Sequence, residues 1–292
     1  MDNNIPFCFL NVYKPEGITS FDVIRRLRKR FNIKKIGHSG TLDPFADGVM
    51  QIAIGNSSRL LEYLNSDKEY IATVKFGYTS STLDIEGDIT KFNKPCFSFE
   101  DLKKTIEMFK GKIEQIPPKY SAIKVNGKKL CDIARKNPHI KTEIPKREVE
   151  IYDIELLDFK NYEATIRVFC SKGTYIRTLG NDIAKKLNTL AYLTKLTRIK
   201  AGNFHIKDSV KIEDADIEKD AIDPICAIQL QKYELNDEEF LLAKNGVCFQ
   251  YQNKKNAQEK ETTLLLIYKN NLVSIGVLSD NKIKIKKFFN QD

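Results

Sequence analysis

Gly37-His38-Ser39-Gly40-Thr41-Leu42-Asp43-Pro44-Phe45-Ala46-Asp47-Gly48 is the segment from which the interpretation of this chain starts. It holds three glycines, one histidine and two acids within twelve residues. Pro44 directs the backbone of Asp43 away from helix, and the glycines permit close approach of chain or ligand. A carboxylate on such a turn beside an imidazole indicates a chemical site. The alternative is a tight connecting loop whose Asp caps backbone N–H groups, and the local pattern leaves both open.

The composition outside this segment is that of a globular protein. With 292 residues, 41% hydrophobic and 30% charged, the chain has room for about two domains. No apolar run approaches the ~20 residues that span a bilayer. The chain begins Met-Asp-Asn-Asn, with no basic region ahead of an apolar segment, so no secretory signal is expected. We expect a cytoplasmic protein that does not enter the membrane.

The cysteines and histidines are scattered along the chain. The six cysteines form no C-x-x-C pair, and the three histidines lie far apart with no cysteine at ligand spacing. We therefore expect neither a disulfide framework nor a metal site.

The net charge of +9 indicates a polyanionic partner. Thr19 and Asp22 form a capping-box pattern that predicts a helix, with Val23, Ile24 and Leu27 on its apolar face. Its other face is basic and leads into the glycine-rich segment: Arg25, Arg26, Arg28, Lys29 and Arg30. Such a face is either simply solvated or binds phosphate groups.

Tyr70 and Arg177 stand out from their local patterns. Tyr70 opens an alternating segment that predicts a strand, and its ring is either part of the core or the floor of a base-binding pocket. Arg177 falls in the first turn of a predicted helix, where the helix dipole favours anions. It is therefore either a plain surface cation or the partner of a carboxylate elsewhere in the site.

Three other regions bear on the organisation of the chain. Residues 115–146 are basic and contain four prolines, with a short helix near 130–135, which favours a binding lid over a loosely packed loop. The acids of residues 84–88 lack the bidentate ligand that a calcium loop needs. Near the C-terminus, a helix capped by Asn236 precedes four short predicted strands between 247 and 288, which indicate a small barrel.

Five collinear blocks give the chain a family resemblance. They are Asn11-Val12-Tyr13-Lys14-Pro15-Glu16-Gly17, Gly37-His38-Ser39-Gly40-Thr41-Leu42-Asp43-Pro44, Asp67-Lys68-Glu69-Tyr70, Pro117-Pro118-Lys119-Tyr120-Ser121-Ala122-Ile123-Lys124 and Cys170-Ser171-Lys172-Gly173-Thr174-Tyr175-Ile176-Arg177. In this order they resemble the bacterial TruB-type tRNA pseudouridine synthases, which convert uridine 55 of the T arm to pseudouridine.

The resemblance implies an α+β fold. We expect a pseudouridine synthase fold with a central mixed, mostly antiparallel sheet flanked by helices, plus a small C-terminal β-barrel similar to a PUA domain. The catalytic domain is expected at 1–231 with a thumb insertion at about 117–146, and the PUA-like RNA-binding domain at 232–292. The expected partner is the T-stem-loop of tRNA, bound by a monomer.

The resemblance also implies a reaction that needs no cofactor or metal. These enzymes cleave the glycosidic bond, turn the base over while it stays bound, and rejoin its C5 to the ribose. Asp43 matches the nucleophile, and Arg177 matches the arginine that holds the pKa of that carboxyl down. Tyr70 matches the aromatic residue that stacks on the base and assists proton transfer.

Further residues match positions that bind the substrate. His38 matches the histidine that fills the space of the extruded nucleotide, and Tyr175 and Leu196 fall where the family lines the uracil pocket. Lys14 is expected to support the loop of the nucleophile. Asp47, the second acid of the glycine-rich segment, is expected to be structural.

Extruding a base costs a few kcal/mol, which phosphate contacts must offset. We expect these contacts from the basic helix and the thumb, at Arg25, Arg26, Arg28, Lys119 and Lys124. The chain departs from the family at Cys131, where an aromatic is usual, and in a charged insertion at 254–261. Two rival hypotheses are a non-catalytic RNA-binding or chaperone protein on the same fold, and an aspartate-dependent hydrolase of small phosphates that requires a metal.

Overall fold

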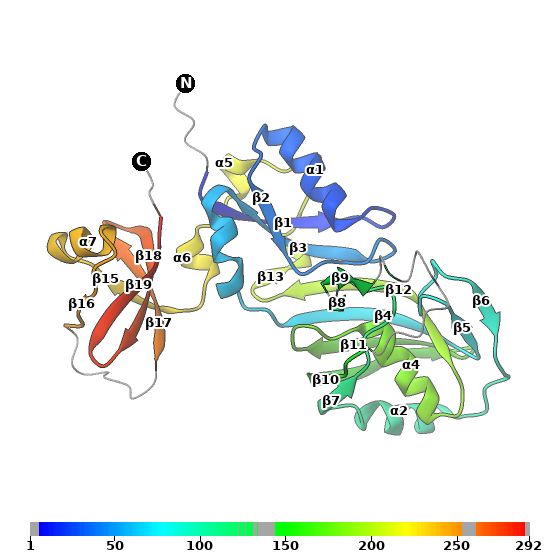
Figure 1. Ribbon diagram of the computed structural model, residues 1–292. Helices are drawn as coiled ribbons and strands as arrows, with labels where there is room; N and C mark the ends of the chain where they lie inside the picture. Colours follow the sequence, from blue (N-terminus) through cyan, green and yellow to red (C-terminus); the bar gives the residue numbers. More distant parts are fainter. Residues whose placement is uncertain are drawn as a thin grey trace.

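A ten-stranded sheet forms the larger part of the molecule (Figure 1). The computed structural model describes residues 6–121, 123–125, 127–130, 133, 144–252 and 261–289. The strand order is β14-β1-β3-β12-β4-β11-β10-β7, with β2 added beside β3 and β13 beside β12. Only β1 with β14 and β12 with β3 pair in parallel among the described pairs of this sheet. The predicted mixed, mostly antiparallel sheet is therefore confirmed.

The strands of this sheet have the following bounds: β1 (Cys8–Lys14), β2 (Ile36–Ser39), β3 (Asp47–Ile54), β4 (Lys68–Phe76), β7 (Gly111–Gln115), β10 (Arg147–Lys160), β11 (Glu163–Cys170), β12 (Ala191–Ala201), β13 (Phe204–His205) and β14 (Val210–Lys211). Strand β4 alternates buried and half-buried residues throughout, as its sequence predicts. Strand β2 was not predicted, because its glycine and polar residues indicate a turn when read alone.

Among the described residues, three helices of eight residues or more pack on this sheet: α1 (Ser20–Phe31), α2 (Phe99–Glu107) and α4 (Ile176–Lys186). The capping boxes at Thr19/Asp22 and Ser98/Asp101 are both complete. A 3-10 helix, η1 (Gly55–Tyr63), follows β3. Short elements complete this part of the chain: β5 (Tyr78–Ser80), β6 (Ile89–Lys91), β8 (Lys124–Val125), β9 (Lys128–Lys129), η2 (Ile206–Asp208), α5 (Ile217–Asp220) and α6 (Pro224–Ala227).

A second, five-stranded sheet follows, drawn in orange and red in Figure 1. It contains β15 (Gln231–Glu234), β16 (Phe249–Gln250), β17 (Thr262–Tyr268), β18 (Asn271–Ser279) and β19 (Lys282–Phe288), beside helix α7 (Asp237–Lys244). The helix capped by Asn236 and the four predicted strands are confirmed. Strand β15 was not predicted. Its first residue, Gln231, pairs with Leu264 of β17.

The two sheets share a hydrophobic cluster. Phe9, Leu60 and Phe204 of the first part pack with Leu265 and Phe289 of the second. The expected helix near 130–135 falls mainly outside the described residues, as does Cys131. Across the described ranges, no helix has the length and apolar character needed to cross a membrane.

Candidate active site

The turn between β2 and β3 presents Asp43 and is held from two sides. Lys14, fully buried at the end of β1, donates through Nζ to the carbonyls of Pro15 (2.9 Å) and Pro44 (3.1 Å). Ser20, the first residue of α1, exchanges hydrogen bonds with the backbone of Leu42. Burial lowers the pKa of Lys14 to about 8. These contacts are those expected of a lysine that supports the loop.

Glycine is required where this turn joins the sheet. Gly48 has a φ of +114°, and a Cβ at this position would lie 2.2 Å from the carbonyl oxygen of Arg198. Gly48 pairs with Arg198 in the parallel β3–β12 ladder. The last glycine of the segment therefore allows two strands to meet beside the turn.

Arg177 connects the loop to two other segments. Its Nε lies 2.9 Å from Oδ2 of Asp43, and its Nη2 donates to Oδ1 at 3.0 Å. Its Nη1 donates to Oδ2 of Asp84 at 3.1 Å. The remaining two N–H groups donate to the carbonyls of Thr82 (2.9 Å) and Tyr120 (3.0 Å). The guanidinium thus contacts two carboxylates and two backbone carbonyls, and of the two alternatives for its position at a helix start the structure shows a carboxylate partner.

The two carboxylates that contact Arg177 differ in solvent exposure. The side chain of Asp84 is 3% exposed and that of Arg177 4%, whereas 33% of the Asp43 side chain remains exposed. A substrate can therefore reach Asp43 but not Asp84. Sequence reasoning considered Asp84 only as a calcium ligand and missed this role, because nothing in its local pattern indicates a partner so distant in the chain.

Burial raises the pKa of the Asp43 carboxyl; the Arg177 guanidinium opposes this rise and the Asp84 carboxylate adds to it. The expectation of a pKa lowered by Arg177 is wrong in its net direction. The reason is that the carboxyl is mostly enclosed and that a second carboxylate shares the same guanidinium.

Tyr70 lies on β4 and is 7% exposed. Burial raises the pKa of its phenol to about 12. Its pairing partner on β12 is Arg198, a fully buried residue that sequence reasoning also missed. His38 is half-buried on β2, where burial lowers the pKa of its imidazole and the charge of Arg198 adds to the effect.

The remaining predicted site residues lie on the adjoining elements. Leu196 is buried on β12, opposite Ala72 of β4. Tyr175 caps the start of α4, and its backbone N–H and C=O both bond to the side chain of Gln115. Asp47 is buried and accepts a hydrogen bond of 2.5 Å from the Tyr13 hydroxyl, in keeping with a structural acid.

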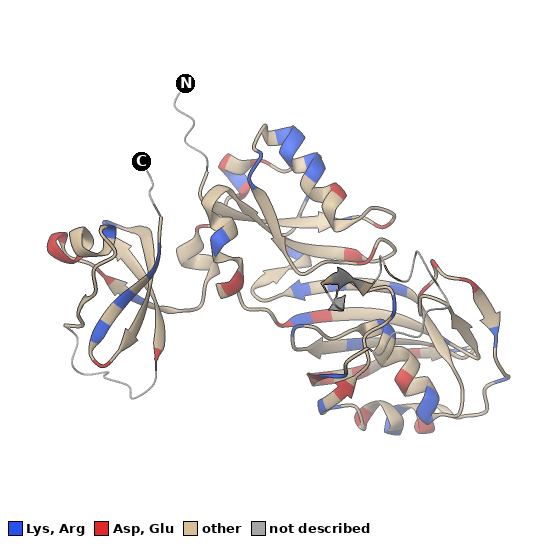
Figure 2. Ribbon diagram, in the orientation of Figure 1, with Lys and Arg blue, Asp and Glu red and all other residues tan. Residues whose placement is uncertain are grey.

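The residues predicted to contact the RNA backbone differ in exposure. Figure 2 shows the basic run on α1, where Arg25 and Arg26 are exposed. Arg28 is half-buried and donates to the carbonyl of Ile36, so part of its role is structural. Lys119 is exposed, and the side chain of Lys124 lies outside what the structure describes.

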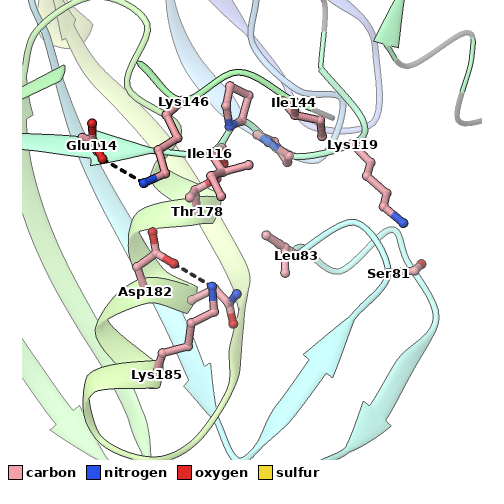
Figure 3. A pocket seen from close by; sticks show the side chains of 13 residues that line it. Ser81, Leu83, Glu114, Ile116, Lys119, Ile144, Lys146, Thr178, Asp182 and Lys185 are labelled. Carbon is pink, nitrogen blue, oxygen red and sulfur yellow. Dashed lines mark hydrogen bonds and ion pairs between the residues drawn. The ribbon is translucent and has the colours of Figure 1, made fainter. Parts of the chain in front are cut away.

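A cavity of about 470 Å³ opens beside α4 (Figure 3). Its lining includes Leu83 and Thr178, the chain neighbours of Asp84 and Arg177. Lys146 and Lys185 on its wall are paired with Glu114 and Asp182. Neither Asp43 nor Tyr70 lines it, so this cavity is not the pocket that the predicted chemistry would use. Within the described ranges, no cluster of three or more His, Cys, Asp or Glu residues could hold a metal ion.

Comparison with known proteins assigns this arrangement to a family. Residues 28–176 match the model of the TruB family pseudouridylate synthase N-terminal domain. The tRNA pseudouridine synthase B of Caldanaerobacter subterraneus subsp. tengcongensis is 38% identical over 286 residues, covering 96% of this chain and 98% of that protein. The chain belongs to the TruB family of pseudouridylate synthases. The expected enzyme class, an isomerase that forms pseudouridine from uridine, is confirmed.

A second relative agrees with this assignment, and a solved structure has a similar fold. The tRNA pseudouridine synthase B of Staphylococcus aureus (strain MRSA252) is 49% identical over 213 residues, covering 70% of this chain and 69% of that protein. The crystal structure of an archaeal box H/ACA sRNP Nop10–Cbf5 complex contains a chain with a TM-score of 0.71 and 22% identity, covering 99% of this chain and 88% of that chain. This likeness confirms the predicted fold, including the small C-terminal β-domain.

Proposed function

We propose that this pseudouridine synthase acts on tRNA, at uridine 55 of the T loop, with Asp43 as its nucleophile. The assignment of Asp43 rests on one observation: of the two carboxylates that contact the Arg177 guanidinium, only Asp43 is exposed enough for a substrate to reach it. Asp84 and Arg177 are enclosed, whereas Asp43 is one-third exposed on a turn that Lys14 and Ser20 hold in place. The family relatives that are named as tRNA pseudouridine synthases support the choice of substrate.

In this proposal the bidentate contact with Arg177 orients the Asp43 carboxylate and favours its ionised form. Asp84 acts as a positioning residue, since it fixes the far side of the same guanidinium. Tyr70 stacks on the flipped uracil, and Leu196 and Tyr175 complete the apolar wall. His38 fills the space that the extruded nucleotide leaves.

RNA binding is assigned to the basic surface. Arg25 and Arg26 would contact the phosphate backbone from α1, with Lys119 and Lys124 from the thumb at about 117–146. We divide the chain into a catalytic domain at 1–231 and a PUA-like RNA-binding domain at 232–292, acting as a monomer in the cytoplasm.

The Asp43→Asn variant tests the assignment of the nucleophile. Asn keeps the size of the side chain but removes its nucleophilic charge, so pseudouridine formation in a T-arm hairpin should fall to the uncatalysed level while RNA binding persists. Asp47→Asn is the matched control on the same segment and should retain activity. Pseudouridine is mapped by chemical modification and sequencing; continued product formation by Asp43→Asn would contradict the mechanism.

Substrate choice is tested with the wild-type enzyme on whole tRNA transcripts. We expect one pseudouridine, in the T loop, and none when that uridine is replaced by cytidine. Modification of a different arm would refute the T-loop assignment. Full activity in excess chelator would argue against the metal-dependent hydrolase hypothesis.

A further inference from the structure

Arg198 is a buried cation that the proposed mechanism does not use. It is fully buried on β12, and no carboxylate of the described residues lies within ion-pair distance of it. Its Nε donates to the carbonyl of Val49 (2.7 Å) and its Nη2 to the carbonyl of Gly40 (3.1 Å). Burying an unpaired charge is costly, so the position of this guanidinium calls for a compensating role.

The remaining nitrogen of Arg198 has no partner within the part of the chain that the structure describes. Its Nη1 is buried and makes no hydrogen bond there. Arg198 and Tyr70 are direct partners in the antiparallel β12–β4 ladder, so their side chains project from the same face of the sheet. The guanidinium is therefore held between the turn that carries Asp43 and the tyrosine expected to contact the base.

The charged and titratable groups that shift the pKa of the Tyr70 phenol come from several elements. Arg198 on β12 lowers the pKa of the phenol, opposing burial, whereas Cys170 at the end of β11 and Asp43 on the turn raise it. Lys68 shares the buried face of β4, but its ammonium donates to the carbonyl of Ser66 at 2.7 Å. Arg198 is thus the cation whose charge acts on the phenol.

We propose that Arg198 is a positioning residue for Tyr70: its unpaired guanidinium orients the phenol and stabilises the phenolate that a proton transfer through Tyr70 creates. This inference rests on the proposed function, in which Tyr70 touches the base. The proposal gives a role to the buried Arg198 guanidinium, which forms no ion pair with a carboxylate of the described residues.

The proton balance of the isomerisation is consistent with this role. The N1–C1′ bond breaks, a C5–C1′ bond forms, and one proton moves overall from C5 to N1. A phenol that gives its proton to the base and later takes the C5 proton ends unchanged. Between these two steps Tyr70 is an anion, and Arg198 faces it.

The first experiment places a difluorotyrosine at position 70, because its more acidic phenol titrates where the protein stays folded, and follows its fluorine NMR shift against pH. The Arg198→Met substitution should raise the pKa of this phenol by roughly 1–3 units. Lys68→Met is the matched control, which removes a neighbouring buried charge, and should change the pKa by less. An unchanged pKa in a folded Arg198→Met protein would overturn the proposal and leave Arg198 as a clamp on the Gly40 carbonyl.

A double-mutant cycle covers the case in which Arg198→Met does not fold. The rate of a single turnover is measured for Arg198→Lys, Tyr70→Phe and the double variant. If Arg198 acts through Tyr70, Arg198→Lys should slow the wild type but add little to Tyr70→Phe. Full additivity would overturn the proposal. Retained activity in Asp43→Asn would instead refute the proposed function, and the fluorine titration, which requires no turnover, keeps the two failures distinct.

Discussion

At the scale of single residues, the site is an arginine shared by two carboxylates. Arg177 orients Asp43 through two bonds and is itself fixed by Asp84 and by two carbonyl oxygens. In the proposed mechanism the carboxyl of Asp43 must be ionised to act as a nucleophile, so we expect activity to fall as the pH drops through its pKa. Asp84 adds to the elevation of that pKa.

Replacing Asp84 by Asn should therefore have two effects with different causes. The loss of one negative charge lowers the pKa of Asp43, so the acid limb of the pH–rate profile moves to lower pH. Looser positioning of Arg177 reduces the maximum rate, by up to ~100-fold. Both are measured as single-turnover rates against pH. The exposed Asp88→Asn is the control from the same loop, and an acid limb that stays in place would contradict the assigned coupling.

At the scale of elements, helix α1 connects the basic surface to the turn that carries Asp43. Its capping box is complete, and Ser20 at its first position is bonded to Leu42 in both directions. The exposed Arg25 and Arg26 are thereby fixed relative to Asp43. A phosphate held by this helix would thus be held at a defined distance from the turn.

Neutralising Arg25 and Arg26 to Gln should flatten the dependence of RNA affinity on salt. Each lost phosphate contact removes roughly 0.7–0.9 from the slope of log affinity against log salt, so the double variant should lose about 1.5. The measurement is a binding titration at several salt concentrations. Lys103→Gln with Lys104→Gln on α2 is the control, since α2 lies at the other end of the sheet (Figure 1). A slope equal to that of the wild type would remove α1 from the interface.

At the scale of the whole molecule, the second sheet is packed against the first part. Phe289 is 1% exposed in the shared cluster, and the guanidinium of Arg59 lies 5.0 Å from the centre of its ring. Arg59 also donates to the carbonyl of Phe288 at 2.9 Å. The C-terminal sheet therefore contributes to the stability of the molecule.

Truncating Phe289 to Ala should lower the free energy of unfolding by about 3–5 kcal/mol, since a fully buried ring leaves a cavity. Urea denaturation followed by circular dichroism measures this change. Phe92→Ala removes an exposed ring and should stay within about 0.5 kcal/mol of the wild type. A loss below 1 kcal/mol in Phe289→Ala would show that the two parts are only loosely joined.

The sequence by itself determined the elements whose signals are local. The alternation of β4, the capping boxes at Thr19 and Ser98, and the need of Arg177 for an anion follow from backbone geometry and dipoles that nearby residues set. The motif blocks then led to the family and to the enzyme class. Such features are readable because each depends on residues within a turn or two of chain.

Only the tertiary structure decided which charges meet. Asp84 and Asp43 reach Arg177 across separations of 93 and 134 residues, and Arg198 faces Tyr70 because β12 pairs with β4. The net pKa of Asp43 likewise depends on how tightly these segments enclose it. Burial and Coulomb energy depend on distance in space, and the packing of the sheet sets that distance.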